Sequence, residues 1–426
     1  MIFLLIILQQ CFGRLLFGFQ WLNFTFNSTN EFDRYRNNKV YADALPTSIQ
    51  VGEGNNYYLC IPRANKDIPA TFVQIVGESS GVLLKPFPDW WANNLTNPAG
   101  FGSIAAFEID LSYNFWLVDE LKSELIKLDQ YGWFLEKYDL SGATSNTTKI
   151  VDVSLDLDRG FAYFSDMGQE GLIVLNMMKN ESTLVLKKHY SVRPDPSFWI
   201  TINGTRVFEN EVLSLGIGGI ALSCDKRSLY YSPISSRNLF VISTQYLRNL
   251  DANIESKVVD LGYKTTASKG IIISEKENMY LSDIQQGNVY YYEQIAPFYL
   301  YFLDYFLKHI MDDENVVWPY HITFDNEKST LLVLANQYQN FLNKTIDFES
   351  PKYGEFNFWV FEVLAKDRSY MYRCKDVISV HSEVDIPVWI YSLISIMSLI
   401  LLTLMICAFK HYRMLKKRHK TLIYAS

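Results

Sequence analysis

The stretch VSLDLDRGFAYFSD, residues 153–166, consists of a short apolar segment, a polar turn and an aromatic-rich segment. Such a pattern predicts two antiparallel strands joined by a tight connection. A third apolar segment usually follows, as in GLIVL at 171–175. Four further copies of the pattern are FEIDLSYNFWLVD at 107–119, IALSCDKRSLYYS at 220–232, IIISEKENMYLSD at 271–283 and HITFDNEKSTLLVLA at 321–335.

The copies begin roughly 45 to 70 residues apart, which is the range of β-propeller blades with some long loops. A blade cannot bury both faces by itself, and radial stacking gives each face a neighbour. We expect a sixth blade to combine NFWVFEV at 357–363 with N-terminal strands such as ATFVQIV at 70–76. Long helical periodicity is scarce, so the predicted fold is all-β: a six-bladed propeller over residues 19–365.

The two ends of the chain predict a membrane topology. Residues 1–18 begin with the apolar run MIFLLIIL and are interpreted as a signal peptide, cleaved near Gly13 or Gly18. Residues 388–409 carry no charge and are long enough to span a bilayer as one helix, for which a buried core helix is the alternative. The basic tail, 410–426, predicts a single-pass type I protein whose propeller is extracellular or lumenal, joined through a stalk at 366–387.

Charge and sequons fit this orientation. Without the six basic residues of the tail, 33 basic and 46 acidic residues remain, a net charge of −13. Such an acidic domain repels nucleic acid and favours neutral or cationic ligands. The predicted partners are therefore the membrane and a small molecule or an extracellular protein. The predicted glycosylation sites are Asn23, Asn27, Asn94, Asn146, Asn180, Asn203 and Asn343.

Cysteines are few. Cys11 falls in the predicted signal peptide and Cys407 in the predicted membrane helix, which leaves Cys60, Cys224 and Cys374. Three cysteines cannot all pair within one chain. The tentative disulfide is Cys60 with Cys374, because it would join the two ends of the domain.

An ordered series of short motifs resembles the yellow / major royal jelly protein family between roughly residues 57 and 365. The resemblance implies a six-bladed β-propeller, in agreement with the repeats. Family members often carry cysteines near the positions matching Leu111 and after Asp119, which this chain lacks, and most have no membrane helix. The motifs are YFSD at 163–166, GLIV at 171–174, RPDP at 193–196, GIGGIALS at 216–223, LYYSP at 229–233, the Trp318–Pro319 pair and LAN at 334–336.

The resemblance also implies a function, because some insect salivary members bind biogenic amines in the central channel. Asn336 and Tyr338 match a segment that contributes contacts there, and an aromatic face attracts an ammonium group. The alternative is that Asn336 ends a strand and Tyr338 packs between blades. Tyr299 and Tyr301, in the aromatic segment 298–310, are further candidates as part of a lid, for which packing on the propeller is the alternative.

Catalysis has little support in the sequence. We find no zinc spacing, phosphate loop or nucleophile elbow, and His189, His309, His321 and His381 are scattered. No catalytic residue and no cofactor is expected.

An enzyme of the dopachrome-converting or calcium-dependent lactonase kind remains the alternative to a binding module. Glu108 and Asp152, with Asn336, are weak candidates for oxygen ligands of calcium. A third interpretation is that YFSD at 163–166 and YLSD at 280–283 are receptor-type propeller repeats. The irregular spacing of the copies argues against this interpretation.

Overall fold

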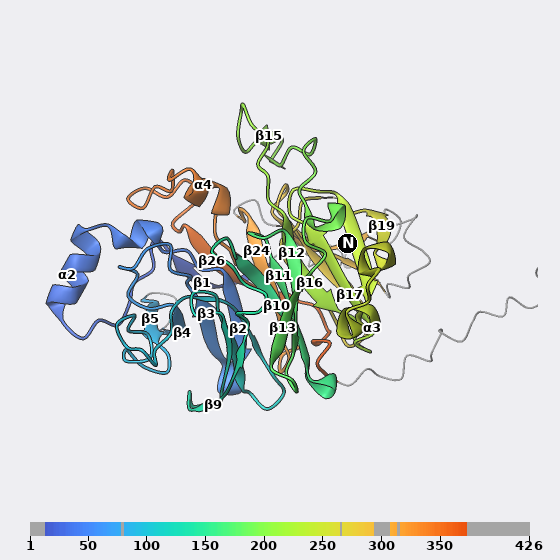
Figure 1. The fold of residues 1–426 in the computed structure, drawn as a ribbon. Coiled ribbons are helices and arrows are strands. Elements are labelled where there is room, and N and C mark those ends of the chain that lie inside the picture. The colour runs from blue at the N-terminus through green and yellow to red at the C-terminus, as the bar shows by residue number, and fades with distance from the viewer. Residues whose placement is uncertain (1–12, 78–80, 265, 294–306, 313–315, 373–426) are drawn as a thin grey trace, which may run out of the picture. The chain divides into compact units, whose positions relative to one another are not determined.

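The computed structural model describes residues 13–77, 81–264, 266–293, 307–312 and 316–372. These residues form six four-stranded antiparallel sheets, the blades of a β-propeller (Figure 1). In the order from axis to rim, the blades are β2 (Ser48–Gly52), β3 (Asn56–Cys60), β4 (Phe72–Val76), β5 (Leu83–Pro86); β6 (Ile104–Ile109), β7 (Phe115–Asp119), β8 (Glu124–Leu128), β9 (Phe134–Asp139); β10 (Ile150–Asp156), β11 (Phe161–Asp166), β12 (Gly171–Asn176), β13 (Glu181–Val185); β16 (Ile217–Leu222), β17 (Ser228–Pro233), β18 (Asn238–Ser243), β19 (Val259–Tyr263); β20 (Ile271–Ile273), β21 (Met279–Asp283), β22 (Asn288–Tyr292), β23 (Leu307–Asp312); and β24 (Pro319–Asp325), β25 (Thr330–Ala335), β26 (Phe358–Leu364), β1 (Arg14–Phe19).

Short helices and one hairpin lie in the connections. In Figure 1, α4 and the β14–β15 hairpin rise from the same side of the blades. The helices are α2 (Thr29–Asn37), α3 (Thr244–Asn249), α4 (Tyr338–Leu342) and the 3₁₀ turns η1 (Val40–Asp43), η2 (Glu53–Asn55), η3 (Leu157–Arg159), η4 (Tyr190–Val192) and η5 (Ile254–Lys257), and the hairpin is β14 (Thr201–Ile202) with β15 (Thr205–Arg206).

The innermost strands close the ring. Each of β2, β6, β10, β16, β20 and β24 contacts the innermost strands of its two neighbours, so the six strands surround one axis. Their side chains are buried almost throughout; β10, β16 and β24 have no exposed residue. Closure of the circle gives every blade a neighbour on both faces, as the repeat pattern requires.

The aspartate that ends the second strand of a repeat explains part of the sequence pattern. Asp119, Asp166 and Asp283 are buried, and each accepts hydrogen bonds from backbone N–H groups of the turn that follows it. Asp119 and Asp166 also accept from the backbone before the innermost strand of their blade, at Ser103 and Lys149. These carboxylates replace water as partners for buried backbone donors and fix the turn against the strand start.

The sixth blade differs from its prediction. Phe358–Leu364 is the third strand of the blade that starts at Pro319, and it pairs with β1, in which Arg14 lies opposite Glu362. The stretch 70–76 belongs instead to a separate blade formed by β2 to β5. The predicted number of blades is confirmed, but the predicted closing strand is wrong, because β1 lacks the repeat motif and pairs with a strand more than 330 residues away.

The membrane topology stays a prediction. Among the described residues no helix is long and apolar enough to cross a bilayer. The predicted span 388–409, the tail and most of the stalk lie outside the described residues. Of the two predicted cleavage positions, one near Gly13 leaves β1 intact, whereas one near Gly18 removes most of it.

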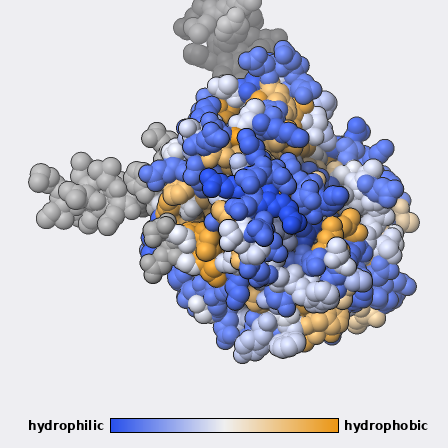
Figure 2. Space-filling view, turned by 90° about the vertical axis from the view of Figure 1, so that its left-hand side faces the viewer, coloured by the Kyte–Doolittle hydropathy of each residue, from blue (hydrophilic) through white to orange (hydrophobic). Residues whose placement is uncertain are grey.

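The N-terminal segment packs as an aromatic cluster beside the propeller. Tyr35 of α2 contacts the rings of Trp21, Phe24, Phe26 and Tyr41 at centroid distances of 5.3–6.2 Å. These edge-to-face and tilted contacts bury the apolar side of α2. Figure 2 shows the molecule from the side on which α2 and β5 lie in Figure 1. This surface is mostly hydrophilic, with separate hydrophobic spots.

The predicted pairing of Cys60 with Cys374 is wrong. Cys60 is a free, fully buried thiol at the end of β3, inside the packing between the first two blades. Cys224 is disulfide-bonded, and its Sγ lies 3.8 Å from the carbonyl oxygen of Tyr372. Cys374 itself lies outside the described residues.

Candidate functional site on the propeller axis

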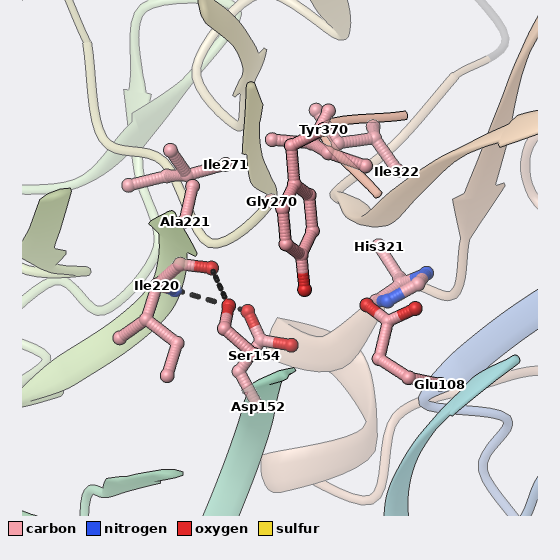
Figure 3. Close-up of a pocket in the computed structure, with 11 residues that line it drawn as sticks. Glu108, Asp152, Ser154, Ile220, Ala221, Gly270, Ile271, His321, Ile322 and Tyr370 are labelled. Carbon is pink, nitrogen blue, oxygen red and sulfur yellow. Dashed lines mark hydrogen bonds between the residues drawn. The ribbon is translucent and has the colours of Figure 1, made fainter. Parts of the chain in front are cut away.

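A small polar cavity lies where the innermost strands meet. Its volume is about 10 Å³, on the scale that holds one water molecule. In Figure 3 the carboxyl groups of Glu108 and Asp152 and the hydroxyl of Tyr370 point toward the same space. The lining residues come from five innermost strands, from Gly270 just before β20 and from Tyr370, and they are Glu108, Asp152, Ser154, Ile220, Ala221, Gly270, Ile271, Ile272, His321, Ile322 and Tyr370.

Glu108 on β6 is held by an amide relay from two other blades. Gln50 Nε2 donates to Glu108 Oε2 at 3.0 Å, and Thr323 Oγ1 donates to Gln50 Oε1 at 2.5 Å. Burial raises the pKa of Glu108 well above its usual range, and the nearby Asp152 carboxyl raises it further. Glu108 therefore favours the protonated form more than an exposed glutamate does.

Asp152 on β10 faces the neighbouring strand β16. Its Oδ2 accepts from the Ile220 N–H at 3.0 Å, and its Oδ1 accepts from the Val153 N–H at 3.1 Å. Ser154 Oγ donates to the Ile220 carbonyl at 3.2 Å, so two side chains of β10 bind one residue of β16. Burial raises the pKa of Asp152, and Lys269 opposes that shift.

His321 on β24 is a neutral imidazole. The Ile49 N–H donates to Nδ1 at 3.4 Å, which leaves the ring proton on Nε2, 3.2 Å from Ser48 Oγ. Burial, and then the charge of Lys269, lower the pKa of His321 well below its usual range. Both nitrogens are thus used within the protein.

Lys269 precedes β20 and is fully buried. Its amine lies 4.9 Å from the centre of the Tyr320 ring and has no hydrogen-bond partner among the described residues. Burial lowers the pKa of this amine, while Asp152 and then Cys60 oppose the shift. A buried amine without a partner is costly unless a ligand or water completes its environment.

A cluster of aromatic and polar side chains extends from Lys269 along β24. We call Lys149, Trp318, Tyr320, Asn336 and Tyr338 the Tyr338 cluster. The Tyr338 ring lies 5.7 Å from that of Trp318 and 5.4 Å from that of Tyr320. Lys149 donates to the Tyr338 hydroxyl at 3.0 Å, and its amine lies 5.6 Å from the ring centre.

Two members of the Tyr338 cluster carry buried atoms without a partner. Asn336 Nδ2 donates to the Pro46 carbonyl at 2.8 Å, but Asn336 Oδ1 and Trp318 Nε1 find no partner in the described part of the chain. The same holds for Gln339 Oε1 beside the cluster. Glu120, close enough to interact with Lys149, has its pKa raised to about 7, chiefly by burial.

The Tyr338 cluster lies at one end of the propeller axis. The other end is covered by residues 366–372, which we call the C-terminal strap. The strap meets the ends of the innermost strands, because the Tyr370 N–H donates to the carbonyl of Ile273, the last residue of β20. The Leu155 N–H donates to the Tyr370 hydroxyl at 2.9 Å. Tyr370 thus reaches from the strap into the axial cavity (Figure 3).

A model of the major royal jelly protein family matches residues 132–365, more than half of the chain. The chain belongs to the major royal jelly protein family. Among curated relatives, it is 25% identical to a Drosophila melanogaster dopaminechrome tautomerase over 353 residues, which cover 74% of this chain and 73% of the relative. It is 24% identical to Drosophila melanogaster protein yellow over 368 residues, which cover 79% and 67%.

Similarity to solved structures is weaker for this royal jelly family member. A luciferin-regenerating enzyme matches at 11% identity and a TM-score of 0.46 over 76% of this chain and 93% of that chain. A streptogramin B lyase matches at 11% identity and a TM-score of 0.40 over 75% and 78%. Similarity at this level transfers neither activity nor site residues.

The family propeller brings together several residues that the sequence suggested separately. Glu108 and Asp152 line one cavity, while Asn336 and Tyr338 lie in the Tyr338 cluster, linked to it through Tyr320 and Lys269. Tyr299 and Tyr301 lie outside the described residues. Within the described ranges, no group of three or more His, Cys, Asp or Glu side chains is placed to hold a metal ion.

The predicted glycosylation sites are accessible with one exception. Asn23 is half-buried, whereas the other six sites are exposed. Asn180 illustrates the setting, because it lies in a turn after β12 and its Oδ1 accepts from the Asp139 N–H, which leaves Nδ2 for modification. Glycosylation itself remains a prediction.

Sequence reasoning missed Lys269, Tyr370, Lys149 and Glu120, and it treated His321 as one of several scattered histidines. Lys149, Lys269 and Glu120 lie within two residues of a strand end, and Tyr370 lies in the C-terminal strap, so the positions of all four depend on connecting segments. A usable signal was present for His321 alone, since it begins the fifth copy of the repeat and so falls on an innermost strand.

Proposed function

We propose that this propeller binds a small organic amine between the Tyr338 cluster and the axial carboxyl groups. The observation that carries the proposal is a set of four buried polar atoms without hydrogen-bond partners among the described residues, namely Lys269 Nζ, Trp318 Nε1, Asn336 Oδ1 and Gln339 Oε1. Native proteins pair nearly all buried polar atoms, so a cluster of exceptions supports a ligand-binding role. The aromatic rings between these atoms suit an organic rather than an inorganic guest.

The charge of the site supports a cation as the ligand. Glu108, Asp152 and Glu120 bring three acids, whereas Lys149 and Lys269 bring two amines, and His321 is neutral. An ammonium group placed among these carboxyl groups would favour their ionised forms and so oppose the effect of burial. The acidic composition of the rest of the chain adds a long-range attraction for cations.

Ligand entry requires side-chain movement. Tyr338 is only 4% exposed, and Lys149 already takes the place on its ring that an ammonium would occupy. Lys149 is exposed and is therefore the member of the Tyr338 cluster best placed to swing into solvent. We infer that the ligand ammonium displaces the Lys149 amine from the ring.

The test is calorimetric titration of the full-length chain, purified in detergent, with serotonin, dopamine and octopamine. Indole and catechol serve as matched ligands that keep the ring and lack the amine. We expect the amines to bind at least ten-fold more tightly than the matched rings. Equal affinities, or no heat with any of the five, would contradict amine binding.

A second candidate function is a tautomerase. One relative is named dopaminechrome tautomerase, and tautomerisation needs an acid and a base but no cofactor. Glu108 and Asp152, whose pKa values burial raises, offer one carboxyl to give a proton and another to take it. Spectrophotometric decay of dopaminechrome with the wild type and with Glu108→Gln tests this role; equal decay in both would exclude it.

We also propose that residues 388–409 hold the propeller at a membrane, with the predicted sequons glycosylated on the same side as the propeller. Carbonate extraction of the full-length chain against a variant lacking 388–409 tests the anchor. Glycosidase treatment followed by intact-mass measurement tests the sequons. Release of the full-length chain by carbonate would contradict the membrane anchor. An unchanged mass after glycosidase treatment would contradict glycosylation.

A further inference from the structure

Two lysines five residues apart are both fully buried, yet their amines differ. Lys264 Nζ donates to two backbone carbonyls, those of Ser236 and Thr266, the second at 2.7 Å. Lys269 Nζ has no hydrogen-bond partner among the described residues and lies against the face of Tyr320. Lys264 is thereby explained as a structural lysine, whereas the amine of Lys269 is left unused by the fold.

The surroundings of Lys269 suit a neutral amine. The ionisable groups close enough to interact with it are Asp152 on β10, Cys60 on β3 and His321 on β24. Burial disfavours the ammonium form and lowers the pKa of both lysines, that of Lys264 to about 7, so the two amines differ in their hydrogen-bond partners. A neutral amine in an apolar site is a nucleophile toward carbonyl carbon.

We propose that Lys269 forms a covalent imine with a small aldehyde that enters the axial site. The amine nitrogen attacks the aldehyde carbon, and one amine proton moves to the carbonyl oxygen to give a neutral carbinolamine. The second proton on nitrogen then moves to the hydroxyl group, which leaves as water when the C=N bond forms. No oxidant or reductant is needed for this step. The adduct needs neither an amine ligand nor tautomerase activity, so it stands apart from the proposed function.

Asp152 is assigned the proton transfers of this reaction. Of the charged groups that act on Lys269, Asp152 favours the ammonium form most strongly. The Asp152 side chain also lines the axial cavity. Protonation of the carbinolamine hydroxyl by a carboxyl group assists the loss of water. Because the cavity has room for about one water molecule, we limit the proposal to the smallest aldehydes, whose entry requires movement of the lining side chains.

The experiment treats the full-length folded chain with acetaldehyde and sodium cyanoborohydride, which reduces an imine to a stable N-ethyl amine, and measures each lysine by peptide mass spectrometry. Lys264 is the matched internal control. We expect Lys269 to be labelled at least ten-fold faster than Lys264 in the folded chain and at the same rate after denaturation. Equal labelling of the two lysines in the folded chain, or no label at Lys269, would overturn the proposal.

The pH dependence separates site chemistry from surface reactivity. Between pH 9 and pH 7 the neutral fraction of an ordinary lysine falls about a hundred-fold. We expect Lys269 labelling to fall less steeply over this range than the labelling of exposed lysines, because burial lowers the pKa of Lys269, and we expect Asp152→Asn to slow labelling at Lys269 without slowing exposed lysines. A decline at Lys269 that parallels the exposed lysines, or an Asp152→Asn variant with an unchanged rate, would count against the assigned chemistry.

Discussion

The two ends of the propeller axis differ in how completely their polar groups are paired. At the C-terminal strap, Asp367 accepts from Asn278 Nδ2 at 2.8 Å and from the Tyr280 hydroxyl at 3.0 Å, and Arg368 pairs with Glu275 at 3.2 Å. At the Tyr338 cluster, buried atoms such as Trp318 Nε1 lack partners within the described residues. The paired groups of the strap end stabilise the fold, whereas we propose that the Tyr338 end keeps its polar atoms for a ligand.

The strap end should show the largest effect on stability. Tyr370→Ala removes a buried ring that spans from the strap to β10, and we expect a loss of about 3–5 kcal/mol in the free energy of unfolding. Thermal and denaturant unfolding measure it. Tyr372→Ala, at a half-buried position of the same strap, is the control. A comparable loss in both variants would show that Tyr370 has no special role.

The Tyr338 end should respond to pH through Glu120. Burial raises the pKa of Glu120 to about 7, against 4.5 for an ordinary glutamate. The folded state therefore holds this proton more tightly than the unfolded state, so the stabilising contribution is complete below about pH 4.5 and is lost as the pH rises through 7. Glu120→Gln should raise the free energy of unfolding at pH 8 by up to about 3 kcal/mol and leave it little changed at pH 5.

Denaturant unfolding at both pH values checks the Glu120 prediction. The exposed carboxyl of Glu136 on β9 supplies the control, as Glu136→Gln. A gain from Glu120→Gln that is the same at pH 5 and pH 8 would contradict the assigned protonation.

Tyr338→Leu should weaken ligand binding more than it weakens the fold. It keeps an apolar side chain next to Trp318 and Tyr320 but removes the ring face, which is worth about 0.5–2 kcal/mol to a bound ammonium. We expect roughly ten-fold weaker amine binding in calorimetry. An affinity for serotonin and dopamine equal to that of the wild type would place the ligand elsewhere.

Lys149→Met should have the smallest effect and the opposite sign. It removes the amine that now occupies the Tyr338 ring and leaves the acids of the site in greater excess. We expect amine binding to strengthen by about two- to ten-fold, on the scale of one cation–π contact. Weaker binding would mean that Lys149 contacts the ligand instead of competing with it.

The repeats were predictable because a strand–turn–strand unit is local in sequence. FYLYFLDYFLKHI at 298–310 shows the limit, since we predicted a lid for this segment, whereas residues 307–310 belong to strand β23 of a blade. The closing strand was not predictable, because β1 pairs with β26 across almost the whole chain and its sequence RLLFGF carries no repeat motif. Likewise, the spacing of cysteines could not reveal that Cys60 points into the packing between two blades.

The sequence by itself determined the blade unit, the number of blades and the family, since each rests on short patterns such as the apolar strand and the aspartate that ends its partner. Tertiary structure alone decided which buried polar groups have hydrogen-bond partners. Lys264 and Lys269 are alike in type, in burial and in their place between two strands. Only the folded chain places the carbonyl oxygen of Ser236 beside the first amine and the ring of Tyr320 beside the second, because both partners come from segments distant in sequence.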